Sequence, residues 1–120
     1  MVVSMDREFT ANVVTTAVES GTHGIQYWAD VLAYEWKGDD YAEAVIMDRE
    51  SGRPHMYPLT HEVIEAGINM IIDRHNAMHL DDSYRVAVRI AVEDNDAGQI
   101  DSELADQIVQ AATLGDVVYG

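Results

Sequence analysis

The fold class depends on residues 25–48, which have the sequence IQYWADVLAYEWKGDDYAEAVIMD. The apolar residues of the first half fit a helix by their spacing, but its aromatic residues and their alternation favour a strand. Gly38 marks a turn, and residues 41–48 alternate well enough to form a second strand. Because this hairpin partner follows, we predict a strand from about Tyr27 to Trp36. A helix over the same residues remains the alternative.

Four helices are predicted outside this hairpin. Apolar residues recur at helical spacing over residues 11–19, 61–74, 83–92 and 102–114. Thr10 and Thr60 are suited to cap the first and second of these helices, and Asp101 or Ser102 the fourth. Gly115 is suited to end the last one. The third segment also alternates over residues 84–92, so a strand there stays an open alternative.

A third strand and a loosely ordered start complete the prediction. Pro54–Tyr57 follows a turn at residues 50–53 and is expected to form a short strand, which lies at a sheet edge if it includes Pro54. Residues 1–9 show no clear period, so we expect a loose lead-in. The chain is therefore predicted to be one α+β domain, residues 1–120, with a small antiparallel sheet of about three strands packed against about four helices.

Composition excludes several classes of protein. The 120 residues are 48% hydrophobic, which is enough to form the core of a single domain. No apolar run approaches the roughly 18–20 residues of a membrane span, and no signal sequence opens the chain, so we expect a cytoplasmic protein. The chain has no cysteine, which excludes disulfides, cysteine-ligated zinc and thiol catalysis.

Charge is the strongest compositional signal. The chain has 22 Asp and Glu residues against seven Lys and Arg, which gives a net charge of −15. Such a surface repels phosphate, so we expect no direct nucleic-acid binding and no binding to anionic membranes. The excess acid fits mimicry of DNA, binding of hard cations, or plain solubility in a salty cytoplasm. Four acids of the base-free final segment are candidates for contact with a basic partner: Asp94, Asp96, Glu103 and Asp106.

Metal and cofactor motifs are weak. The segment Asp94–Asp101 resembles a calcium loop, but with Gly98 at the sixth position the twelfth would be Leu104 and not glutamate. A turn followed by an Asp101 cap explains this segment better. His75 and His79 have the i, i+4 spacing of a zinc pair, but a site needs a convergent third ligand. We therefore expect no bound metal and no cofactor.

The segment GTHGIQYW, residues 21–28, is the best local signal of a function. A glycine-rich turn that presents Tyr27 and Trp28 has the composition of a recognition site, with His23 inside the turn. The alternative is that both aromatic side chains belong to the core. No nucleophile elbow surrounds a serine and no phosphate loop is present, so the sequence nominates no catalytic residue.

The two ends of the chain resemble a known family. Thr15–Gly21 (TTAVESG) with Gly24–Ala29 (GIQYWA), and Ala105–Gln110 (ADQIVQ) with Gly115–Gly120 (GDVVYG), are similar to segments of small phage and prophage proteins of the actinobacteriophage type. Ser20 stands where that family usually has a second glycine. The resemblance implies a viral origin. It implies no activity, so no catalytic residue is carried over.

Together these features favour a non-enzymatic phage accessory protein that binds a protein of the host cell. We expect an acidic face, with Tyr27 and Trp28 as contact residues, to cover a basic host surface. The alternative is a small enzyme or ligand-binding protein with a pocket beside Gly21–Gly24. Apolar residues on both faces of the Tyr27–Trp36 strand also predict a homodimer.

Overall fold

The predicted hairpin is the centre of a three-stranded antiparallel sheet. In the computed structural model, which describes residues 2–52 and 55–120, β1 (Ala29–Trp36), β2 (Ala42–Asp48) and β3 (Met56–Leu59) lie in the order β1-β2-β3. A helix over residues 25–36 is thus excluded. The strand begins at Ala29 and not at Tyr27, because the Trp28 N–H bonds to the Ile25 carbonyl (3.1 Å) and closes a turn before the ladder starts.

A β-bulge in β1 changes which residues share a face. Val31 and Ala33 pair with consecutive residues of β2, so Leu32 is an extra residue in the ladder. The expected alternation placed Leu32, Tyr34 and Trp36 on one face, and this is wrong. Beyond the bulge, Tyr34 and Trp36 share the inner face with Val31, while Leu32 and Ala33 lie on the outer face.

The third strand begins later than predicted. It covers Met56–Leu59 and pairs with β2, whereas the sequence placed it at Pro54–Tyr57. Residue 53, the last of the predicted turn, and Pro54 lie outside the described residues. Pro58 fits this strand because β3 is an edge strand, where proline can occur without costing a ladder bond.

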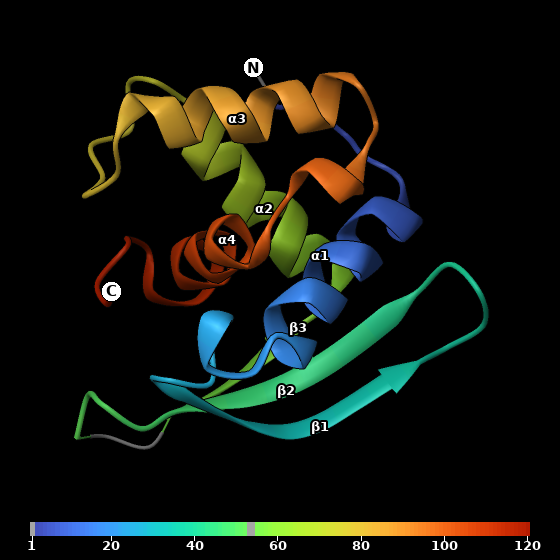
Figure 1. Ribbon diagram of the computed structural model, residues 1–120, viewed down its shortest axis with the longest axis vertical. Coiled ribbons are helices and arrows are strands. Elements are labelled where there is room, and N and C mark those ends of the chain that lie inside the picture. Colours follow the sequence, from blue (N-terminus) through green and yellow to red (C-terminus); the bar gives the residue numbers. More distant parts are fainter. Residues whose placement is uncertain (1, 53–54) are drawn as a thin grey trace.

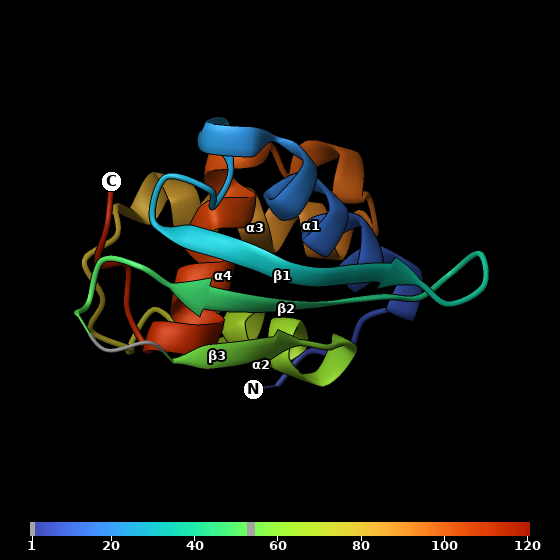
Figure 2. The same cartoon turned by 90° about the horizontal axis from the view of Figure 1, so that it is seen from below.

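The four helices lie on one side of the sheet (Figures 1 and 2). They are α1 (Arg7–Glu19), α2 (His61–Ile72), α3 (Asp82–Glu93) and α4 (Ser102–Leu114), and two short 3-10 helices, η1 (Gly21–His23) and η2 (Ala97–Gln99), connect other elements. In Figure 1, α1 lies against the sheet, α2 and α4 pack on α1 and on each other, and α3 lies farther from the sheet, against α2. None of the helices among the described residues is long and apolar enough to cross a membrane.

Local signals located most helix ends correctly. The Thr60 hydroxyl accepts a bond from the Val63 N–H (3.3 Å), and the Asp101 carboxylate accepts one from the Leu104 N–H (2.8 Å). Gly115 ends α4 with a φ of 80°. Residues 84–92 are helical, so the strand alternative is excluded.

The N-terminal segment is more ordered than expected. Helix α1 begins at Arg7, so Thr10 is not its cap but a buried residue inside the helix, whose hydroxyl donates to the Arg7 carbonyl (3.1 Å). Ahead of the helix, the Val3 N–H donates to the Asn69 side chain of α2 (2.7 Å). This long-range contact supplies order that the local sequence does not encode.

The core lies between the sheet and helices α1, α2 and α4. Fully buried aliphatic side chains come from all of these elements, among them Val13, Val14, Ile46, Leu59, Ile64, Ile68 and Ile108. Arg85, a charged residue on α3, is also buried. Its guanidinium donates to the carbonyls of Ile71, Asp73 and Asn76 at 2.6–2.8 Å, which compensates for its loss of water. Arg85 therefore satisfies carbonyls at the end of α2 and fixes α3 there.

Candidate functional site

The two chain segments that carry the family resemblance meet at one buried carboxylate. Asp106 on α4 accepts bonds from the Tyr27 hydroxyl (2.6 Å), the Trp28 indole N–H (2.8 Å) and the Gln110 amide (3.0 Å). Trp28 is 0% exposed and Asp106 only 6%. Three protein donors thus replace the hydrogen bonds to water that the carboxylate loses when it is buried.

The C-terminal tail closes over this carboxylate. The Gln110 side-chain oxygen accepts the N–H groups of Val118 and Tyr119 (both 2.8 Å), and its amide donates to the Tyr119 carbonyl (3.2 Å). The Tyr119 ring stacks on Trp28 with centroids 5.4 Å apart, and its hydroxyl donates to the buried Asp48 (3.1 Å). We call Tyr27, Trp28, Asp106, Gln110 and Tyr119 the Asp106 cluster.

Electrostatics keep the phenols of this cluster protonated. Burial, reinforced by the Asp106 carboxylate, raises the pKa of Tyr27 well above its ordinary value. Burial and the Asp48 carboxylate raise the pKa of Tyr119 in the same direction. Both phenols therefore act as hydrogen-bond donors at neutral pH and not as bases. Since each donor named here has its acceptor either in the cluster or in the neighbouring Asp48, the arrangement fits a network that holds α4, the tail and the start of β1 together.

The predicted contact residues differ in whether their side chains are exposed. Trp28 and Asp106 are buried, so neither offers its side chain to a partner on the surface of this fold, and Asp106 does not belong to the acidic surface where the sequence placed it. Tyr27 is half-buried, with its hydroxyl turned toward Asp106. His23 is exposed in η1, and its ring makes no hydrogen bond within the described residues. The core alternative therefore describes Trp28 better than the recognition alternative.

The Gly21–Gly24 turn is tightly packed. The Ile25 N–H bonds to the Ala17 carbonyl (3.2 Å), and a Cβ on Gly24 would lie only 2.2 Å from that same oxygen. Glycine is needed here because the turn passes directly over the end of α1. The four surface cavities that we describe among residues 2–52 and 55–120 lie elsewhere, so they give no support to a pocket beside this turn.

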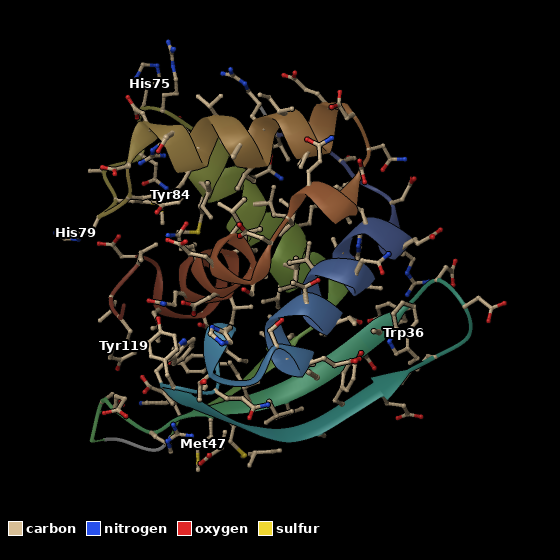
Figure 3. All side chains as sticks on the ribbon, viewed as in Figure 1. Trp36, Met47, His75, His79, Tyr84 and Tyr119 are labelled. Carbon is tan, nitrogen blue, oxygen red and sulfur yellow. The ribbon has the colours of Figure 1, made fainter. Side chains whose placement is uncertain are left out.

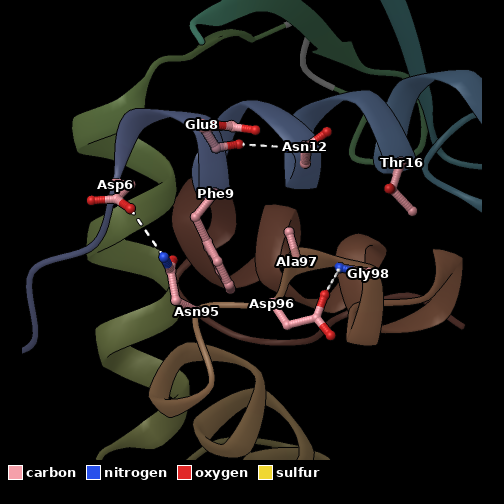
Figure 4. A pocket seen from close by; sticks show the side chains of 9 residues that line it. All are labelled: Asp6, Glu8, Phe9, Asn12, Thr16, Asn95, Asp96, Ala97 and Gly98. Carbon is pink, nitrogen blue, oxygen red and sulfur yellow. Dashed lines mark hydrogen bonds between the residues drawn. The ribbon is translucent and has the colours of Figure 1, made fainter.

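Exposed carboxylates line a groove between the start of α1 and η2 instead (Figure 4). This cavity, of about 420 Å³, is lined by Asp6, Glu8 and Asp96, and Phe9 points into it from α1. Asn95 closes one side by donating to Asp6 (3.1 Å). None of the described lining residues is a lysine or arginine. We call these five residues the acidic groove.

The two remaining acidic candidates, Asp94 and Glu103, lie at opposite ends of α3. Asp94 ends α3 and is tied to Asp96 through the Gln99 amide, which donates to both carboxylates (3.0 and 3.3 Å). Glu103 instead accepts from the Tyr84 hydroxyl (2.7 Å) in the first turn of α3. Ten helical residues separate these positions, which is about 15 Å along the axis. Of these candidates, therefore, Asp96 lines the acidic groove, Asp94 lies beside it and Glu103 lies away from it.

The possible metal motifs have other roles. Helix α2 ends at Ile72 and not at residue 74, so His75 and His79 are not on a common helical face, and Figure 3 shows them apart. His79 bonds to Asp116 (2.6 Å), and its backbone N–H lowers the pKa of that carboxyl. Asp96 caps η2 and Asp101 caps α4, as the turn interpretation predicted. No group of three metal-ligating side chains occurs among the described residues.

A second notable cavity lies between the end of α2 and α3. It has a volume of about 500 Å³ and combines the apolar Val3, Ile72 and Val92 with the guanidinium groups of Arg74 and Arg89. Arg89 faces Glu93 (3.7 Å), whereas Arg74 has no hydrogen bond or ion pair within the described residues. Asp73 and Glu93 also line the cavity, so Arg74 is the side chain that could bind an anionic group here.

Sequence reasoning missed six residues of the Asp106 cluster and the acidic groove, among them Phe9 and Asn95. Asp6 and Glu8 were treated as part of a loose lead-in, and Gln110 and Tyr119 as ordinary helix and tail residues. The Asp106 and Gln110 spacing of i, i+4 inside an apolar helix was the one available signal. Comparisons with protein-family models, with curated proteins and with solved structures find no match to this chain.

Proposed function

We propose that this chain is a non-enzymatic accessory protein of phage type that binds a basic surface of a host protein. The observation that carries the proposal is the acidic groove, where three exposed carboxylates line one cavity without a described lysine or arginine. The Asp106 cluster then has a structural role, because it holds the fold that presents this groove.

The groove suits the side chain of a lysine or arginine. The half-buried Ala97 provides apolar contact for the methylene stem, while the Asp6, Glu8 and Asp96 carboxylates that line the groove would attract the cationic head. A net charge of −15 also speeds encounter with a basic partner and slows encounter with nucleic acid. The partner class is therefore a protein with exposed basic side chains.

The experiment compares two variants that lose the same amount of charge. The groove variant carries Asp6→Asn, Glu8→Gln and Asp96→Asn, which keep side-chain size and hydrogen-bond acceptors. The control variant carries Glu50→Gln, Asp81→Asn and Asp82→Asn, which are exposed at the β2–β3 connection and the start of α3, away from the groove (Figure 1). Each protein is used for cross-linked capture from host lysate at low and high salt, followed by mass spectrometry.

We expect a host protein that the wild type and the control variant capture at low salt and the groove variant does not. With that protein purified, the association rate should fall about tenfold for the groove variant and fall with added salt for the wild type. Equal capture and equal association rates for the two variants would contradict the acidic-groove mechanism.

A second candidate function is binding of a small anionic ligand between α2 and α3. The cavity of about 500 Å³ with Arg74 and Arg89 above apolar residues favours it, since ligand sites usually have volumes of about 300–1,000 Å³. Thermal-shift screening of amphiphilic carboxylates against the wild type and Arg74→Gln tests this idea. A ligand that stabilises only the wild type supports the idea, and a library with no hit counts against it.

A further inference from the structure

The face of the sheet that points away from the helices is apolar and uncovered. In Figure 2 the sheet faces the viewer with all helices behind it, and in Figure 3 Met47 points away from the helices. Cross-strand pairing places six apolar residues together on this outer face: Leu32, Ala33, Val45, Met47, Met56 and Pro58. Met56 is 68% exposed and Leu32 is 48% exposed. We call these six residues the open sheet face.

The bulge at Leu32 produces much of this surface. Without the extra residue, strict alternation would turn Leu32 and Ala33 to opposite sides of β1. With it, both lie on the outer face beside Val45, and the apolar area is continuous across the three strands. A continuous exposed apolar patch on a small protein marks an interaction surface.

Two acidic residues beside the open sheet face form ion pairs with basic residues of the same sheet region. Asp30 bonds to Arg49 (2.7 Å) and Glu43 bonds to Lys37 (2.6 Å), so among the described residues Glu35 is the acid of the outer face that has no ion pair. The protein as a whole has a net charge of −15, and the acidic groove lies on a different part of the molecule. Electrostatic repulsion between two copies is therefore small at this face compared with the acidic surface.

We propose that two copies of this chain pair through their open sheet faces about a two-fold axis. A basic partner would gain little here, because two of the three acids of this face are already paired, whereas a second copy presents the same apolar face with little charge. Three strands about 4.8 Å apart and five residues at about 3.4 Å give a face of roughly 14 by 17 Å. That is smaller than the roughly 800 Å² that each partner of a standard interface buries, so the dimer dissociates on dilution.

Sedimentation equilibrium of the full chain across a concentration and salt series tests the proposal. We expect a monomer–dimer equilibrium that shifts toward dimer at high salt, because salt screens the remaining repulsion over about 10 Å or less. The variant Leu32→Lys with Met56→Lys should stay monomeric. The matched control, Val86→Lys with Ile90→Lys, makes the same change at exposed apolar positions of α3 and should dimerise as the wild type does.

A cysteine variant keeps the test valid if the lysine variant does not fold. Because the chain has no cysteine, Leu32→Cys and Ile90→Cys each carry a single thiol. A short bismaleimide should cross-link Leu32→Cys into dimers far faster than Ile90→Cys. The groove variant described above should dimerise at least as well as the wild type, which separates this proposal from the proposed function.

Three results would overturn the pairing. One is a wild-type protein that is monomeric at every concentration and salt level, which leaves the face to a different partner. The second is a dimer that the α3 variant abolishes while the sheet variant retains it. The third is equal cross-linking of the two single-cysteine proteins.

Discussion

Replacing Asp106 with alanine should destabilise the whole fold, although the sequence alone places this residue on an acidic surface. The substitution removes the acceptor of three donors, which differ in what they can do afterwards. Trp28 is fully buried and its indole N–H finds no other acceptor, so it is left unsatisfied. Tyr27 is half-buried and can bond to water, and Gln110 keeps the Tyr119 carbonyl as an acceptor.

The expected cost follows from this inventory. One orphaned buried donor and the loss of a charge-assisted bond cost about 2–3 kcal/mol, because relief of the buried charge offsets part of the loss. For a domain of this size that corresponds to a fall in melting temperature of roughly 10 °C. Asp106→Asn should cost about 1 kcal/mol or less, since its amide oxygen still accepts the Trp28 N–H and the Tyr27 oxygen can accept in turn.

The assay is urea unfolding followed by tryptophan fluorescence at pH 7. Glu103→Ala is the matched control: it removes an exposed carboxylate from the same helix and should cost about 0.5 kcal/mol or less. An Asp106→Ala protein with the wild-type midpoint, or alanine and asparagine variants of equal stability, would refute the view that this carboxylate is an internal acceptor.

Three further outcomes are expected. Gly67→Ala should cost about 1–3 kcal/mol in urea unfolding, because its Cβ would lie 2.6 Å from the Ala112 Cβ and force α2 and α4 apart, while unchanged stability would mean that the helices adjust freely. Asp101→Ala should cost about 1 kcal/mol by calorimetry, since it removes the cap on the Leu104 N–H, and Asp101→Asn should restore most of it. Stability should fall as the pH rises above about 10, because the pKa of Tyr27 is raised in the fold and the unfolded chain therefore loses its phenolic proton first. Urea midpoints across that pH range should decline less steeply for Tyr27→Phe than for the wild type.

Much of the fold could be predicted because its signals are local. The hairpin follows from a turn glycine between two alternating segments, and the start of α2 and both ends of α4 follow from Thr60, Asp101 and Gly115. Each of these devices acts within about four residues, so nothing distant has to be known to identify it. The α+β class, with three antiparallel strands and four helices, came from those signals.

The candidate site was harder, because charge composition does not say where a charged side chain lies. Asp94, Asp96, Glu103 and Asp106 look alike in a chain with a net charge of −15. The structure buries Asp106 and places Glu103 at the other end of α3 from Asp94. Burial of a carboxylate depends on donors from distant segments, here Trp28, and those cannot be inferred from neighbours along the chain.

Tertiary structure alone decided the surfaces that carry both proposals. The acidic groove joins Asp6 to Asn95, 89 residues apart, and exists only because α1 packs beside η2. The open sheet face depends on the bulge at Leu32. The pairing of β1 with β2 places the bulge there, and the conformational propensity of Leu32 itself does not. The sequence by itself determined the elements and most of their ends, since local bonding stabilises them. Contacts between segments distant along the chain determined which faces those elements buried and which they left exposed.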